Sequence, residues 1–105
     1  MGRVAWQTEF KIEIEILIQE LKKIETLFSL EKNGIKCYIF GSSLNKKCPN
    51  DFDILVLYDS EEHLSNIKQG FKSIAKSFPL HLNYFTFLEE EELNFIEQQN
   101  AREIF

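Results

Sequence analysis

The feature that most constrains this chain is a pair of carboxylates at the start of an apolar run. Asp51 and Asp53 stand one residue apart, and the run "DFDILVLY" continues from them to Tyr58. In a β-strand, residues two apart project from the same face, so the two carboxylates would lie side by side. Adjacent carboxylates repel, and holding them near an apolar core costs free energy unless a cation joins them. The pattern therefore indicates a strand with a cation site at its entrance.

The rest of the chain predicts an α/β domain around this strand. Apolar residues recur at helical spacing from Phe10 to Phe28, although the alternation between residues 10 and 16 also suits a strand. The predicted elements are a helix over 8–34, strands over 35–41 and 51–58, a helix over 60–78 capped by Ser60, a strand over 80–87, and a helix that begins with a Thr86–Glu89 capping box and runs to 105. This α-β-turn-β-α-β-α order predicts a single domain over residues 1–105, with a small mixed sheet of about three strands flanked by helices.

Composition narrows the class of protein. The 105 residues suffice for one hydrophobic core, 44% of them are apolar, and no window is apolar enough to cross a membrane. A formal net charge of -5 argues against nucleic acid as a tightly held partner. The N-terminus lacks the pattern of a signal peptide, and Cys37 and Cys48 lack CxxC spacing. We therefore expect a cytoplasmic protein in which Cys37 is a buried thiol.

A Gly-Ser pair precedes the carboxylates. Gly41, Ser42 and Ser43 follow the first predicted strand. Glycine lets a phosphate approach the backbone closely, and hydroxyl and backbone N–H groups bind phosphate oxygens. Mg²⁺ commonly sits between carboxylates and substrate phosphates. Each pattern alone is often an ordinary turn or a solvated strand start, but the two together predict nucleotidyl or phosphoryl transfer.

The segment "FGSSLNKKCPNDFDILV" resembles the signature of the nucleotidyltransferase superfamily that includes DNA polymerase β. That signature is an apolar strand, Gly-Ser, a short spacer and Asp-x-Asp in a second apolar strand. The length and element order are similar to those of the minimal nucleotidyltransferases. The resemblance implies that Gly41 and Ser42 hold the triphosphate of an NTP, ATP in particular, and that Asp51 and Asp53 bind Mg²⁺ or Mn²⁺.

The resemblance also implies a reaction and a partner. Many minimal members are encoded beside a helical HEPN-type protein, as an antitoxin that can transfer AMP to it. The expected function is transfer of a nucleoside monophosphate to an acceptor, such as a hydroxyl of a partner protein in a toxin–antitoxin pair. Lys46 or Lys47 would neutralise phosphate charge.

Two departures from the family pattern keep an alternative open. The spacer between Ser42 and Asp51 has eight residues, which is short, and the strand expected to carry a third carboxylate reads "LHLNYFTF". Its nearest polar residues, His81 and Asn83, share one face, but histidine is a weak Mg²⁺ ligand and asparagine is uncharged. His81 is equally well explained as a surface or structural histidine. The run Glu89–Glu92 is typical of a solvated first helical turn, although one of these residues could replace the acid.

The chain is therefore expected to be either an Mg²⁺-dependent nucleotidyltransferase or a catalytically weak or inactive module of the same fold that neutralises or scaffolds a partner. A second apolar set on the first helix bears on that partner: Ile12, Ile16, Leu27 and Leu30. Either the C-terminal helix ending in "REIF" covers this set, or it docks a second copy or a HEPN-type protein.

Overall fold

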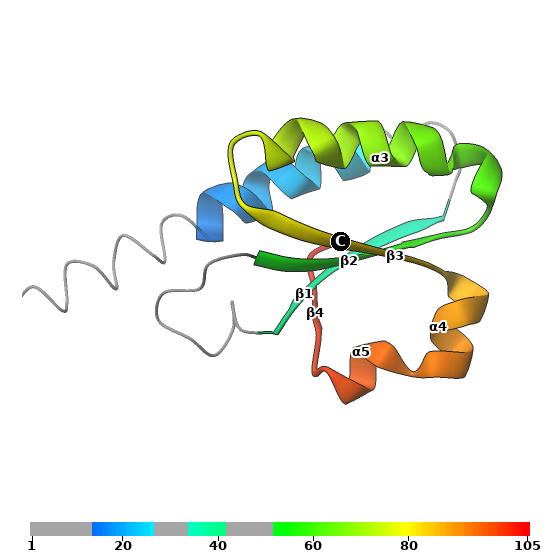
Figure 1. The fold of residues 1–105 in the computed structure, drawn as a ribbon. Coiled ribbons are helices and arrows are strands. Elements are labelled where there is room, and N and C mark those ends of the chain that lie inside the picture. The colour runs from blue at the N-terminus through cyan, green and yellow to red at the C-terminus, as the bar shows by residue number, and fades with distance from the viewer. Residues whose placement is uncertain (1–13, 27–33, 42–51) are drawn as a thin grey trace, which may run out of the picture.

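The computed structural model describes residues 14–26, 34–41 and 52–105 of the chain (Figure 1). Four strands form one mixed sheet in the order β3-β2-β1-β4, with β1 antiparallel to both of its neighbours and β2 parallel to β3. The elements are a first helix over 14–26, β1 (Ile35–Phe40), β2 (Phe52–Tyr58), α3 (Glu61–Ala75), β3 (Leu80–Thr86), α4 (Phe87–Leu93), α5 (Phe95–Gln98) and β4 (Arg102–Glu103). The α/β class is as predicted, and β4 adds a strand to the expected three.

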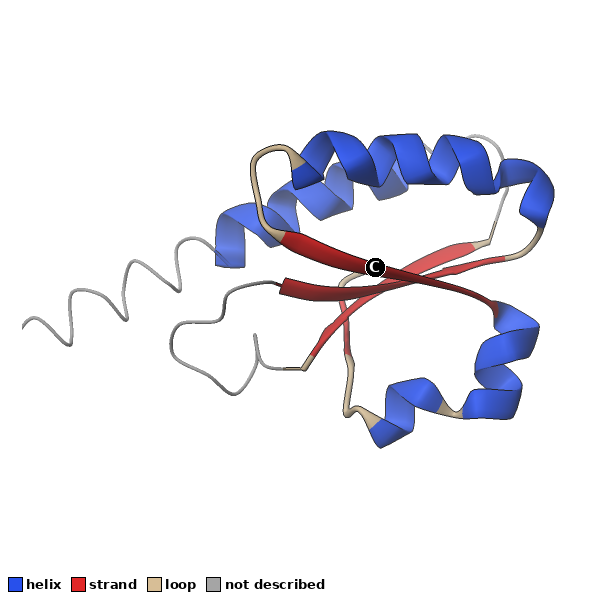
Figure 2. Ribbon diagram, viewed as in Figure 1, coloured by secondary structure: helices blue, strands red, loops and turns tan. Residues whose placement is uncertain are grey.

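The sheet is the middle layer of the structure. The first helix and α3 cover one face, and the short helices α4 and α5 cover the other (Figure 2). The larger buried cluster lies between the sheet and the first two helices, whereas the smaller one, which includes Phe40, Leu55 and Leu57, faces α5. Since neighbouring residues of a strand point to opposite faces, β2 contributes Ile54 and Val56 to the first cluster and Leu55 and Leu57 to the second.

The first helix buries the stripe that its sequence predicts. Leu17, Leu21 and Ile24 are buried, and Ile14 and Ile18 pack against them as half-buried neighbours. This spacing matches one face of an α-helix, so the helical interpretation holds for residues 14–26. The ends of the predicted stripe, at residues 10 and 28, lie outside the described residues.

Both central strands are largely buried, as their apolar composition predicts. Cys37, at the middle of β1, is fully buried, and this burial raises the pKa of its thiol. The helix α3 buries Ile67 and Phe71 and ends at Ala75, four residues before Pro79. Ser60 stands at its N-cap position, but its side chain makes no capping hydrogen bond.

The prediction of one continuous C-terminal helix is wrong beyond Leu93. Asn94 adopts a left-handed conformation with φ 53°, and Asn100 does so with φ 52°. Asparagine tolerates this conformation better than most residues, so it can end a helix. The chain then turns back as β4, where the Ile104 N–H donates to the Cys37 carbonyl at 2.7 Å and the Cys37 N–H donates to the Phe105 carbonyl at 3.1 Å. Ile104 and Phe105 gain burial that a helical end would not provide.

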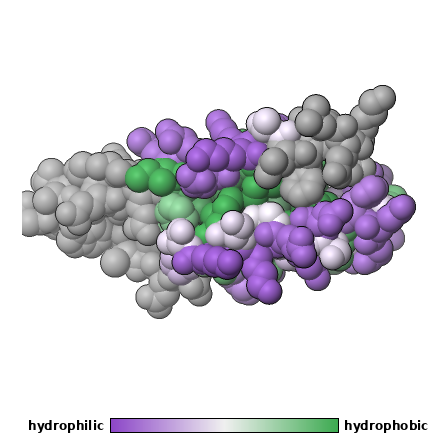
Figure 3. Space-filling model, turned by 90° about the horizontal axis from the view of Figure 1, so that it is seen from above, coloured by the Kyte–Doolittle hydropathy of each residue, from purple (hydrophilic) through white to green (hydrophobic). Residues whose placement is uncertain are grey.

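The C-terminal segment therefore does not cover Ile16, the described member of the second apolar set, as a helix. Ile104 and Phe105 belong to the same buried cluster as Leu17, and Ile16, on the opposite side of the first helix, is 45% exposed. Ile12, Leu27 and Leu30 lie outside the described residues. Figure 3 shows the helical layer from above, with hydrophilic residues on both sides of a hydrophobic strip.

Within the part of the chain that the structure describes, no helix has the length and apolar character needed to cross a bilayer.

Candidate functional site

Asp53 lies at the start of β2, between two neighbouring strands. It is paired with Phe40 of β1 on one side and with His81 of β3 on the other. By strand alternation its side chain projects from the same face as Leu55 and Leu57, at the end of the sheet where β1 finishes. The carboxylate is 21% exposed. It is thus partly shielded from water and still accessible to a ligand.

His81 is the side chain of β3 that meets this carboxylate. Its Nδ1 lies 3.1 Å from Asp53 Oδ1, and the imidazole is 65% exposed. The contact follows from the parallel register, which places the two residues side by side on one face. It is a hydrogen bond for the neutral ring when Nδ1 carries the proton, and an ion pair when the ring is protonated.

Gly41 closes the site from the side of β1. Its φ of 76° lies in the left-handed region, and a Cβ built there would lie 3.2 Å from Asp53 Cγ and would collide with Asp53 Oδ2. Two features therefore favour glycine at this position: the backbone conformation and the close approach of the carboxylate. Gly41, the residue directly after β1, therefore lies against the side chain of Asp53.

Asn83 does not contact the Asp53 carboxylate. Its Nδ2 donates to the main-chain carbonyl of Ile54 at 3.3 Å, and its side chain is half-buried. The amide therefore binds the backbone of β2. Of the two polar residues predicted on this strand, His81 is the one that contacts Asp53.

The glutamates of α4 lie at the other end of β3. Glu89 Oε1 accepts from the Thr86 N–H at 2.8 Å, and the Thr86 hydroxyl accepts from the Glu89 N–H at 3.1 Å, so Glu89 completes the predicted capping box. Thr86 follows His81 by five residues of strand, roughly 16 Å at about 3.3 Å per residue. Glu89 therefore does not supply the missing third carboxylate beside Asp53.

The remaining predicted site residues lie outside the described residues: Ser42, Ser43, Lys46, Lys47 and Asp51. Within residues 14–26, 34–41 and 52–105, no three side chains of His, Cys, Asp or Glu come together to hold a metal ion. Asp53 and His81 together offer one carboxylate and one imidazole, which are too few ligands to hold a metal ion. Imidazole also suits transition metals better than Mg²⁺. A cation at Asp53 would therefore need Asp51 as well.

The contact between Gly41 and Asp53 was missed by sequence reasoning, which assigned Gly41 to phosphate binding alone. Twelve positions separate the two residues, and no local pattern reports that they touch. The antiparallel pairing of Phe40 with Asp53 brings them together.

No protein-family model, curated protein or solved structure matches this chain.

Proposed function

We propose that this chain is a minimal nucleotidyltransferase that moves a nucleoside monophosphate from an NTP, ATP in particular, to a hydroxyl of a partner protein. The observation that supports this most is the contact between the Gly41 backbone and the Asp53 carboxylate. A phosphate held at Gly41 and a divalent cation held at Asp53 would be neighbours, as the transfer of a phosphoryl group requires.

The residues have distinct roles in this reaction. The acceptor oxygen forms a bond to the α-phosphorus of the NTP, the bond from that phosphorus to the pyrophosphate oxygen breaks, and the hydroxyl proton passes to a base. Mg²⁺ or Mn²⁺, when bound by Asp51 and Asp53, offsets the negative charge of the phosphates. Ser42, Ser43 and the N–H groups after Gly41 hold the phosphate oxygens, and Lys46 adds positive charge.

His81 replaces the third carboxylate in this proposal. With its Nδ1–H donated to Asp53, its Nε2 is left to accept the proton of the acceptor hydroxyl. An imidazole adds no negative charge to the cation site, so it holds a divalent cation less firmly than a carboxylate would.

The contact between His81 and Asp53 also supports a second candidate function. If the His81–Asp53 pair weakens cation binding enough to prevent turnover, the domain is a nucleotidyltransferase-like module that binds and neutralises a partner protein. The two functions differ in whether a bound nucleotide is cleaved, and both place nucleotide at the Gly41 turn.

The test is nucleotide binding followed by transfer. Calorimetry with ATP and with the other NTPs, in Mg²⁺ and in Mn²⁺, should show metal-dependent binding that Asp53→Asn abolishes. Asp59→Asn is the matched control, because Asp59 is an exposed carboxylate just beyond the opposite end of β2. Labelled NTP, Mn²⁺ and the protein encoded beside this chain should then give a labelled partner. Binding without labelling supports the non-catalytic module, and no binding at millimolar nucleotide with either metal contradicts both.

Two substitutions on β3 test whether His81 occupies the position of the missing third carboxylate. His81→Asp puts a carboxylate beside Asp53 and should raise the transfer rate. Asn83→Asp should not, because the new carboxylate would replace a donor that binds the Ile54 carbonyl. A larger gain from Asn83→Asp than from His81→Asp would show that the cation lies elsewhere on β3.

A further inference from the structure

The outer edge of β3 is a second candidate surface for binding a partner. Of the strands that the structure describes, β3 is the last on its side of the sheet. The Phe52 N–H donates to the Pro79 carbonyl at 2.8 Å. Given the parallel register, residues 81, 83 and 85 then direct their main-chain groups toward β2. The N–H and C=O groups of Leu80, Leu82 and Tyr84 therefore point outward from the sheet.

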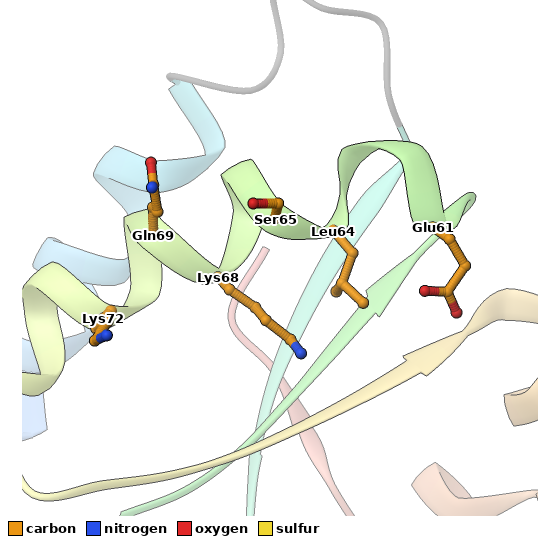
Figure 4. A pocket seen from close by; sticks show the side chains of 6 residues that line it. All are labelled: Glu61, Leu64, Ser65, Lys68, Gln69 and Lys72. Carbon is orange, nitrogen blue, oxygen red and sulfur yellow. The ribbon is translucent and has the colours of Figure 1, made fainter.

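A hollow lies along α3, on the helical side of the sheet. It has a volume of about 450 Å³, and Figure 4 shows its lining on α3, with Leu64 and Lys68 directed toward the sheet. The side chains of Leu80, Leu82 and Tyr84 project into the same face and are only half-buried. The edge thus combines unpaired main-chain groups with an incompletely covered apolar surface. The residues lining the hollow are Glu61, Leu64, Ser65, Lys68, Gln69 and Lys72.

Positive side chains outnumber negative ones along the hollow, with Lys68 and Lys72 against Glu61. Lys68 and Lys72 of α3 and Lys76, directly after its end, follow one another at four-residue spacing, so they form one row, which we call the lysine row. The Lys68 ammonium lies 5.3 Å from the centre of the Tyr84 ring. Within the described part of the chain, no carboxylate lies within ion-pair distance of a member of this row. In a chain of net charge -5, this makes a local patch of opposite sign.

We infer that the β3 edge binds an extended, acidic segment of a partner protein, which joins the sheet as an additional strand. The main-chain groups of Leu80, Leu82 and Tyr84 would pair with the segment, as in other cases of strand addition to an open edge. Alternate side chains of the segment would face α3, where glutamate or aspartate meets the lysine row. The remaining side chains would face the opposite side of the sheet.

The lysine row favours this occupant over a second copy of the chain. Two β3 strands related by a twofold axis would pair antiparallel in one continuous sheet, with both α3 helices on the same face. The two lysine rows would then face each other across the junction and repel. An acidic segment is attracted by the same charges, and because the lysines are exposed, that attraction should weaken as salt is added.

This inference does not depend on the proposed nucleotidyl transfer. The lysine row lies over the face of the sheet opposite to the Asp53 carboxylate, so variants of one surface leave the other intact.

The test uses an acetylated and amidated seven-residue peptide in which glutamate alternates with valine. Titration into the labelled protein should shift the NMR amide signals of Leu80, Leu82 and Tyr84 and slow their hydrogen exchange. Lys68→Glu with Lys72→Glu should weaken binding at least tenfold. The matched control is Lys22→Glu with Lys23→Glu, the same charge change on exposed positions of the first helix, which should leave the affinity within twofold.

Two further peptides separate main-chain pairing from charge. A peptide with lysine in place of glutamate should not bind. An acidic peptide methylated at alternate backbone nitrogens should no longer bind through the peptide edge that carries the methyl groups. Equal binding to the wild type and to the Lys68→Glu, Lys72→Glu variant would overturn the inference. So would no binding at millimolar peptide, or concentration-dependent protection of the β3 amides without peptide, which would identify a second copy as the occupant.

Discussion

At the scale of single residues, the candidate site depends on how closely Gly41 and Asp53 approach. The carboxylate occupies the place where any other residue at position 41 would put its Cβ. Gly41 also has a φ of 76°, a conformation that disfavours side chains by about 1–2 kcal/mol. The absence of a side chain at Gly41 thus leaves room for the Asp53 carboxylate of β2.

We predict that Gly41→Ala lowers the free energy of unfolding by more than the backbone conformation alone explains. In an Asp53→Ala background the carboxylate is gone, so Gly41→Ala should cost only the roughly 1–2 kcal/mol of an unfavourable φ. The measurement is urea unfolding followed by far-UV circular dichroism for all four proteins of the cycle. An equal cost of Gly41→Ala in both backgrounds would contradict the close contact.

At the scale of elements, α3 and α4 begin in different ways although both have a good capping residue. Thr86 and Glu89 form a reciprocal capping box at the start of α4, whereas the Ser60 side chain makes no such bond at the start of α3. The α4 helix has seven residues and no buried side chain, so its own packing stabilises it little. It depends on its cap more than the fifteen-residue α3 does.

We predict that Thr86→Ala destabilises the protein by about 1 kcal/mol, because the Glu89 N–H loses the side-chain oxygen that accepts its hydrogen bond. Thr86→Ser keeps the hydroxyl and should restore most of that loss. Ser60→Ala is the contrasting change and should alter the unfolding free energy by only a few tenths of a kcal/mol. Urea midpoints of the three variants test this, and a larger effect at Ser60 than at Thr86 would refute the difference between the caps.

At the scale of the whole molecule, the end of the described chain completes the core. β4 pairs with β1, and Ile104 and Phe105 pack in the same cluster as residues of the first helix. Phe105 is 7% exposed, and its carbonyl accepts from the Cys37 N–H. The first, middle and last parts of the described chain therefore meet in one buried cluster.

We predict that Phe105→Ala lowers the free energy of unfolding by about 3–5 kcal/mol, the usual cost of removing a buried aromatic ring. Arg102→Ala, an exposed position in the same short strand, should cost less than about 0.5 kcal/mol. Equilibrium unfolding of both variants gives the comparison. Similar small values for both would mean that the C-terminal strand does not contribute to the core.

The sequence by itself determined the elements whose signals are local. The apolar stripe of the first helix, the two apolar strands, the burial of Cys37 and the Thr86–Glu89 capping box follow from periodicity and residue type over a few neighbouring positions. It also predicted a site around Gly41 and Asp53, because a Gly-Ser pair after one apolar strand and Asp-x-Asp at the start of the next are more specific together than either is alone.

Only the tertiary structure decided which distant residues meet. The choice of His81 over Asn83 beside Asp53 depends on the register of β3 against β2, and a shift of two residues would have placed Asn83 there instead. The strand β4 replaced a predicted helical end because two asparagines could turn the chain and Ile104 and Phe105 could be buried against β1. Helical periodicity is a property of neighbours in sequence, whereas strand register and the burial of a chain end depend on the free energy of contacts between distant segments.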